Sequence, residues 1–150
     1  MLAMAGERKL RVISQGGGEV IRHRLRILIG DDDRDTAATL MAILRDEGHE
    51  VNTVLRGDDA LDVARLMRPD VVILDVNMPG MSGYAVAGEL RKRHGAVAPL
   101  LIAISGVWTK PSDVAIGKQA GFDHYLLKPC DPAELLSLLE PLSVALRHGH

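Results

Sequence analysis

The sequence predicts a single α/β domain in which a parallel sheet is covered by helices on both faces. The chain has 150 residues, which is the size of one domain, and 47% of them are hydrophobic, enough for one ordinary core. From Arg26 onward, short apolar runs alternate with segments whose apolar residues recur every three or four positions. This alternation, without any internal sequence repeat, predicts five consecutive βα units.

The five predicted strands are short runs rich in Val, Ile and Leu, which is typical of parallel strands buried on both faces. They cover residues 26–29, 50–55, 71–74, 100–104 and 125–127.

The five predicted helices lie between and after these strands, at residues 36–47, 57–67, 83–92, 111–120 and 132–146. In the last of them, four leucines share one face: Leu135, Leu138, Leu139 and Leu142. Gly48 and Gly121 follow helices as expected C-caps, and Asp131 followed by Pro132 predicts a helix start.

The two ends of the chain differ from this pattern. Residues 1–25, with the Gly triplet at 16–18, are expected to form a flexible basic extension. Residues 26–146 form the predicted domain, 147–150 a short tail, and no output domain is expected.

Composition excludes several classes of protein. The 18 basic and 20 acidic residues nearly balance, so we expect no general attraction to nucleic acid or a membrane surface. The single cysteine, Cys130, excludes an intramolecular disulfide. No apolar run approaches the roughly 20 residues of a membrane span. We expect a cytoplasmic protein.

Polar residues follow four of the predicted strands. Asp31 and Asp32 follow the first strand, Asp75 the third, Ser105 the fourth and Lys128 the fifth. Ligands of open α/β sheets bind beyond the carboxyl ends of the strands, so these side chains should meet at one edge. Each has an ordinary explanation as a turn or cap residue. Together, however, clustered carboxylates resist ionisation unless a cation compensates their charge.

A hard divalent cation such as Mg²⁺ suits one or two carboxylates together with water and phosphate oxygens. In this interpretation Asp31 and Asp32 hold the metal, and Asp75 attacks a phosphoryl group to form an acyl phosphate. Lys128 neutralises developing charge, and Ser105 donates a hydrogen bond to the phosphate. A Pro-Gly turn in residues 77–83 is expected to keep Asp75 accessible.

Three segments resemble the receiver domains of bacterial two-component response regulators, the CheY-like proteins. These are Ile-Leu-Ile-Gly-Asp-Asp-Asp at 27–33, the loop that begins at Asp75 and runs to Tyr84, and Tyr-Leu-Leu-Lys-Pro at 125–129. The resemblance covers about residues 26–146. It implies a flavodoxin-like (βα)₅ fold with strand order 2-1-3-4-5.

The resemblance also implies roles for the site residues. Asp75 is the expected phosphorylation site, and Asp32, Asp75 and the main-chain carbonyl of Asn77 are expected to surround Mg²⁺, or Mn²⁺ in its place. Asp31 contributes through water. Ser105 and Lys128 stabilise the phosphate.

A phosphorylation switch is implied as well, with Ser105 and Tyr125 as its paired hydroxyl and aromatic ring. The implied phosphodonor is a histidine kinase or a histidine phosphotransfer protein, and the downstream protein target is not identified by the sequence. No nucleic-acid or membrane partner is expected, and the protein is expected to be a monomer or weak dimer. The Lys128–Pro129 bond is a candidate cis peptide.

This sequence departs from the family pattern at a few positions. Gly30 replaces a β-branched residue, so the first strand is expected to be locally loose. Ser105 stands where Thr is commoner. Trp108 is expected to cover the edge of the site, and Cys130 to be a small buried hydrophobic residue.

The leading hypothesis is a stand-alone receiver of a phosphorelay, a regulatory phosphoacceptor rather than an enzyme, with slow self-dephosphorylation. One alternative is a Mg²⁺-dependent phosphohydrolase with an aspartyl-phosphate intermediate. Such enzymes place a second acid–base Asp two residues after the nucleophile, where this chain has Asn77. Another alternative is a receiver scaffold that acts without phosphorylation.

Overall fold

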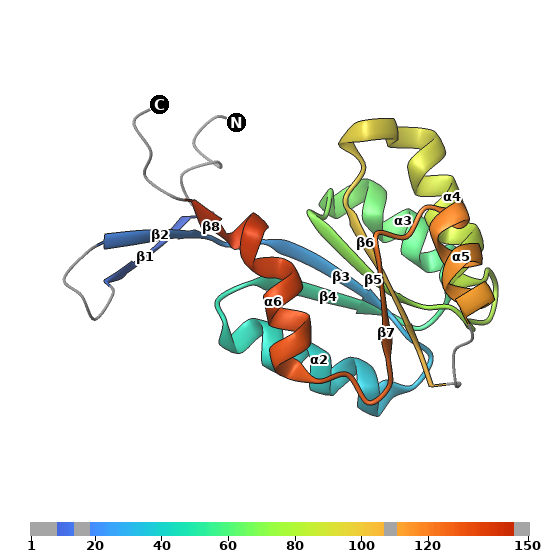
Figure 1. The fold of residues 1–150 in the computed structure, drawn as a ribbon, viewed down its shortest axis with the longest axis horizontal. Helices are drawn as coiled ribbons and strands as arrows, with labels where there is room; N and C mark the ends of the chain where they lie inside the picture. Colours follow the sequence, from blue (N-terminus) through green and yellow to red (C-terminus); the bar gives the residue numbers. More distant parts are fainter. Residues whose placement is uncertain (1–8, 14–18, 107–110, 146–150) are drawn as a thin grey trace.

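A five-stranded parallel sheet forms the centre of the molecule in the computed structural model, which describes residues 9–13, 19–106 and 111–145 (Figure 1). Its strands are β3 (Arg26–Gly30), β4 (Glu50–Val54), β5 (Val71–Asp75), β6 (Leu100–Ser105) and β7 (His124–Leu127). The spatial order is β4-β3-β5-β6-β7. Counted along the chain, this is the order 2-1-3-4-5, so the predicted flavodoxin-like fold is confirmed.

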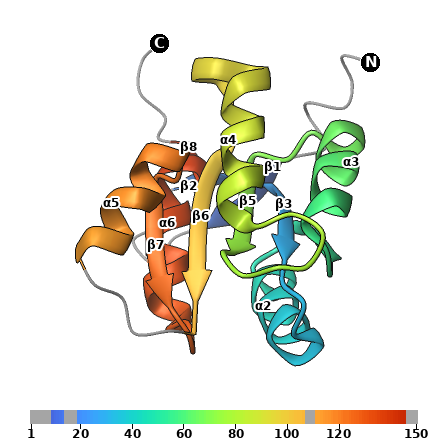
Figure 2. The same cartoon turned by 90° about the vertical axis from the view of Figure 1, so that its right-hand side faces the viewer.

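Helices cover both faces of this sheet. They are α2 (Arg34–Asp46), α3 (Gly57–Met67), α4 (Gly83–His94), α5 (Pro111–Ala120) and α6 (Pro132–Ser143), with a 3₁₀ turn, η1 (Gly95–Val97), after α4. Figures 1 and 2 show α2 and α6 on one face and α3, α4 and α5 on the other. This is the predicted three-layer arrangement.

The core is divided by the sheet because side chains alternate along each strand. Ile27 and Ile29 of β3 pack with α2 and α6, whereas Leu28 between them packs with α3 and α4. All five residues of β5 are buried, as expected for a central strand covered on both sides.

Side chains and glycines define the helix ends as the sequence indicated. Asp131 caps α6 by accepting a hydrogen bond from the Ala133 N–H, and Pro132 occupies the first turn. Gly48 and Gly121 adopt positive φ angles of 92° and 119° after their helices. The Lys128–Pro129 peptide is cis, as predicted.

The N-terminal part differs from the expected flexible extension. Strands β1 (Lys9–Ile13) and β2 (Glu19–His23) pair antiparallel, and β2 also pairs with β8 (Val144–Ala145). The helix predicted over 132–146 ends at Ser143 for the same reason, because Val144 becomes extended to pair with Arg22. The predicted tail at 147–150 and Trp108 lie outside the described residues. None of the helices in the described segments has the length and apolar character to cross a membrane.

A half-buried histidine joins β3 to the α2–β4 turn. The main-chain N–H of Leu25 donates a hydrogen bond to Nδ1 of His49 at 3.1 Å, so this nitrogen is unprotonated. Burial lowers the pKa of His49; the charge of Glu47 opposes this shift, and those of Arg22 and Arg24 add to it. Protonation would place a charge in this environment and remove the hydrogen-bond acceptor.

The His49 environment predicts a pH-dependent stability. The folded-state pKa lies below the unfolded value of about 6.5, so the unfolded chain binds the proton more tightly. Stability from this group is therefore complete above about pH 6.5 and decreases as the pH falls toward the folded-state pKa. His49→Asn, which retains an acceptor, should flatten this part of the profile in urea unfolding measured between about pH 5 and 8. Parallel profiles for the wild type and the variant would contradict the assignment.

Candidate functional site

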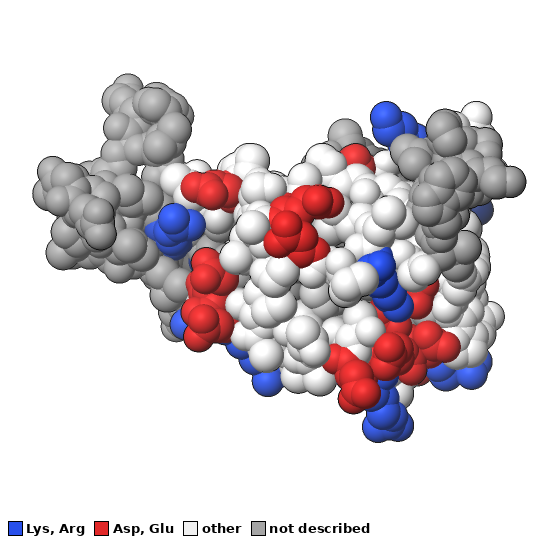
Figure 3. Space-filling model, turned by 60° about the horizontal axis from the view of Figure 1, so that its bottom comes forward, with Lys and Arg blue, Asp and Glu red and all other residues white. Residues whose placement is uncertain are grey.

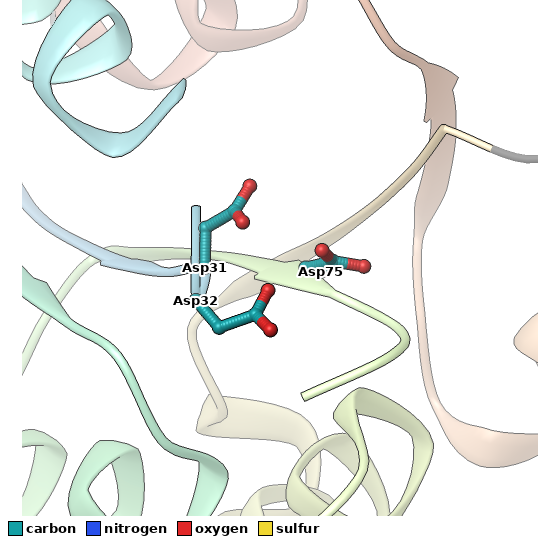
Figure 4. Close-up of side chains that lie close together, drawn as sticks. All are labelled: Asp31, Asp32 and Asp75. Carbon is teal, nitrogen blue, oxygen red and sulfur yellow. The ribbon is translucent and has the colours of Figure 1, made fainter. Parts of the chain in front are cut away.

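Three aspartates meet at the carboxyl edge of the sheet. Asp31 and Asp32 follow β3 and Asp75 ends β5, and each contributes a carboxylate oxygen to a group in which these atoms lie within 4.8 Å of one another (Figure 4). Asp31 and Asp75 are buried, whereas Asp32 is exposed. The sheet thus brings together the acidic residues that the sequence predicted.

The main chain fixes the two buried carboxylates. The Asp31 N–H bonds to the Val54 carbonyl at 3.0 Å, which extends the β3–β4 pairing to the site. Oδ1 of Asp31 then accepts from the Asp33 N–H at 2.9 Å, and Oδ1 of Asp75 accepts from the Asn77 N–H at 3.0 Å. In each carboxylate the other oxygen, Oδ2, remains for a cation.

That cation is Lys128, at the end of β7. Its Nζ lies 2.7 Å from Oδ2 of Asp31 and 2.9 Å from Oδ2 of Asp75. Burial lowers the pKa of Lys128, but the hydrogen bonds and charges of the two carboxylates outweigh burial and raise it above its usual value. One ammonium, which follows β7, therefore reaches past β6 to the carboxylates at the ends of the adjacent strands β3 and β5.

The site still has too little positive charge. Burial raises the pKa of Asp31 above its usual value despite the opposing effect of Lys128, and the charge of Asp75 adds to the increase. Oδ2 of Asp31 is fully buried and lacks a well-aligned hydrogen-bond donor among the described residues, although Nζ of Lys128 is close. A hard divalent cation fits this arrangement of carboxylate oxygens.

Ser105 and Tyr125 lie on the same face of the sheet, on adjacent strands. Ser105 is buried at the end of β6 and pairs with Leu127, while Tyr125 pairs with Ala103, two residues earlier in β6. The Tyr125 ring packs against α5 at Gly117, where an added Cβ would lie 3.4 Å from Cδ2 of the ring. The position of Asn77 is also defined: it is exposed, and its N–H holds Asp75.

Two glycines bring backbone segments into close contact at the site. A Cβ at Gly83 would lie 2.5 Å from the main-chain oxygen of Asp75, so the start of α4 can pack directly on the backbone of this residue. A Cβ at Gly57 would overlap the carbonyl of Met81, and the Gly57 N–H bonds to the Pro79 carbonyl. Sequence reasoning missed Gly57, because only the folded loop brings residues 79–81 to it.

The expectation that β3 is locally loose at Gly30 is wrong, because the strand is regularly paired there. Gly30 pairs with Val54 on one side and Leu74 on the other. An added Cβ would lie 2.9 Å from a Leu74 methyl and 3.2 Å from the sulfur of Met78, which is buried. Glycine here makes room for the methionine that anchors the loop after Asp75. Cys130 is half-buried against the α2–α6 side of the core, and burial raises its pKa.

Comparison with known proteins gives one consistent family. Residues 27–140 match the model of the response regulator receiver domain. The DNA-binding response regulator MtrA of Mycobacterium tuberculosis is 40% identical over 114 residues, covering 76% of this chain and 48% of that protein. The transcriptional regulatory protein PrrA of Mycobacterium leprae is 38% identical over 117 residues, which cover 78% of this chain and 49% of PrrA. The chain spans about half the length of these curated relatives.

Solved structures agree with this match. The structure of chemotaxis response regulator CheY4 of Vibrio cholerae has a TM-score of 0.72 and 31% identity, and the match covers 79% of this chain and 98% of the CheY4 chain. A second structure is the receiver domain of sensor histidine kinase PA1611 from Pseudomonas aeruginosa, which has a magnesium ion in its active-site cleft. Its TM-score is 0.70 and its identity 29%, and the match covers 79% of this chain and 96% of the PA1611 receiver domain.

Removal of the bridging ammonium should destabilise the fold. Lys128→Ala leaves two buried carboxylates without their cation, which costs about 3 kcal/mol in the free energy of unfolding. Urea unfolding at neutral pH without divalent ions measures this difference. The matched control is Lys92→Ala on the exposed side of α4, which should change stability by less than about 0.5 kcal/mol. Equal effects of the two substitutions would show that the bridge is not a stabilising contact.

Proposed function

Because this chain belongs to the response regulator receiver domain family, we propose that it accepts phosphate on Asp75 in a two-component phosphorelay. The observation that carries this proposal is the contact of one lysine with two buried aspartates at the carboxyl edge of the sheet. This arrangement holds one carboxylate oxygen of Asp75 next to a positive charge that a phosphoryl group also requires.

The proposed step is a transfer of a phosphoryl group from a histidine to Asp75. A carboxylate oxygen of Asp75 forms a bond to phosphorus while the bond from phosphorus to the histidine nitrogen breaks, and the product is an acyl phosphate. Lys128 then stabilises the phosphate oxygens as a point charge, and the Asn77 N–H continues to orient Asp75. Ser105, which ends β6 at the same edge, would donate a hydrogen bond to the phosphate.

The proposed metal is Mg²⁺, or Mn²⁺ in its place, held by Asp31, Asp32, Asp75 and the main-chain carbonyl of Asn77. When bound, it would neutralise charge on the phosphate oxygens. The exposed position of Asp32 leaves room for the waters that Mg²⁺ usually retains.

Phosphorylation is proposed to change the surface around α4, β7 and α5 through Ser105 and Tyr125. Both residues lie on the α4–α5 side of the sheet, so a shift of the Ser105 hydroxyl toward phosphate would free space beside the ring. We propose a histidine kinase or histidine phosphotransfer protein as donor, and a protein as the target of the changed surface.

The proposed contacts of this domain are with proteins rather than nucleic acid. Two relatives are DNA-binding or transcriptional regulators by name, but this chain matches only about half of each. Exposed carboxylates gather over the start of α2 beside the site (Figure 3), at Asp32, Asp33 and Asp35. This surface, at the carboxyl end of the sheet, repels a phosphate backbone.

Self-dephosphorylation is proposed to be slow. Asn77, two residues after Asp75, is exposed and offers an amide in place of the carboxylate that would act as acid and base. The same feature disfavours turnover of external phosphomonoesters.

Acetyl phosphate tests the phosphorylation site. With Mg²⁺, the wild type should gain one phosphate by intact mass, and Asp75→Asn should gain none because an amide does not form the acyl phosphate. Asp59→Asn, an exposed carboxylate on α3, is the control and should label like the wild type. Labelling of Asp75→Asn at the wild-type rate would refute the proposed site, and steady release of phosphate from p-nitrophenyl phosphate would favour a phosphohydrolase.

Mg²⁺ should stabilise the folded protein, because only the folded chain assembles the three carboxylates. The melting temperature should rise with Mg²⁺ concentration, and Asp32→Asn should weaken the apparent affinity about tenfold or more. Asp33→Asn, which removes a neighbouring charge but keeps an oxygen that can cap α2, is the control and should keep both the Mg²⁺ affinity and the stability close to those of the wild type. Equal Mg²⁺ affinity in wild type and Asp32→Asn would exclude Asp32 as a ligand.

A further inference from the structure

A groove lies at the end of the sheet opposite the aspartates. Its volume is about 610 Å³, and it is bounded by the C-terminal halves of α3 and α4, by η1, and by the prolines that precede β5 and β6. Figure 2 shows α3 and α4 on the same face of the sheet. We call it the basic groove; its apolar members include Ala64 and Leu90, and its polar members are Arg65, Arg68, Arg93 and His94.

Every polar side chain in the basic groove is a cation or can become one. Basic residues in the last turn of a helix have an ordinary role, because they oppose the helix dipole. Arg93 also contacts Glu89 at 3.4 Å. The side chains of Arg65 and Arg68, however, form no hydrogen bond or ion pair with any residue that the structure describes, so their guanidinium groups are available to a ligand.

Arg68 has a backbone conformation that disfavours its side chain. Its φ is 50°, in the left-handed region, where it ends α3 with an N–H bond to the Ala64 carbonyl. Glycine occupies this conformation without the steric cost that a Cβ adds. Arginine at such a position is consistent with a functional use of the guanidinium group.

One apolar side chain of the groove is unusually exposed. Val97, which lines the groove, is 86% exposed. The lining also includes the buried side chains of Ala64 and Leu90. An exposed apolar surface with a charged rim is typical of a protein contact.

We propose that the basic groove binds an acidic, amphipathic segment of a partner protein. Arginine pairs with carboxylates through two parallel hydrogen bonds, and the apolar lining accommodates the aliphatic side chains of the same segment. A small-molecule site usually adds neutral polar side chains that fix the orientation of its ligand, and His94 is the only lining residue of this groove whose side chain can be both polar and neutral. The segment would leave Asp75 accessible, because the two sites lie at opposite ends of the strands.

The test uses the full chain and a fluorescein-labelled synthetic peptide of Glu-Leu-Leu-Glu repeats, with a Lys-Leu-Leu-Lys peptide of equal length as the charge-reversed probe. Fluorescence anisotropy should show saturable binding of the acidic peptide only, weaker at high salt. Amide resonances of residues at the ends of α3 and α4 should shift in ¹⁵N-edited NMR spectra.

Three variants separate charge recognition from damage to the fold. Arg65→Gln and Arg93→Gln should each weaken the affinity about three- to fivefold. Arg68→Gly should weaken it similarly while leaving the melting temperature equal or about 2 °C higher, since the strain is removed. Lys92→Gln, on α4 but outside the groove, is the control and should bind like the wild type.

Several results would overturn the proposal. They are an absence of saturable binding of the acidic peptide, equal binding of the basic peptide, or equal affinity of the groove variants and Lys92→Gln. Displacement of the acidic peptide by inorganic pyrophosphate at equal concentration would also overturn it, because the groove would then recognise a small anion.

Discussion

The contact of Lys128 with Asp31 and Asp75 is the interaction on which the rest of the site depends. Its three residues come from β3, β5 and β7, and Nζ of Lys128 lies within 2.9 Å of both carboxylates. Removing charges from water is costly, so such a cluster persists only where the surrounding structure holds it in register. The parallel pairing of five strands provides that register, because each strand ends at the same edge.

Close packing around Asp75 transmits this constraint to the neighbouring loop. Gly83 allows α4 to contact the backbone of Asp75, and Gly30 leaves space for Met78 beneath the loop. Each contact is too short for a larger side chain without movement of backbone or core atoms. The loop is therefore held from below by the core and from the side by α4, while Asn77 at its surface remains exposed.

Local patterns predicted most of this architecture from the sequence. Periodicity predicted five helices and five strands, and the rule for open α/β sheets predicted that Asp75 and Lys128 share one edge of the sheet. What remained unpredicted depends on residues far apart in the chain. The pairing of Arg22 with Val144 converts the end of a helical pattern into β8, and the contact of Gly57 with Met81 exists only in the folded loop. No local pattern reports either contact.

The aspartate site and the basic groove lie at opposite ends of the sheet and are lined by side chains of opposite charge. Carboxylates surround the site at the carboxyl ends of the strands, and guanidinium groups line the basic groove at the amino ends. The five residues of β5 span roughly 17 Å between them, which is about twice the Debye length at physiological ionic strength. Exposed charges at that separation are largely screened from one another. Packing offers a route between the two ends that does not depend on screening, because α4 packs on the backbone of Asp75 at Gly83 and both α3 and α4 line the groove.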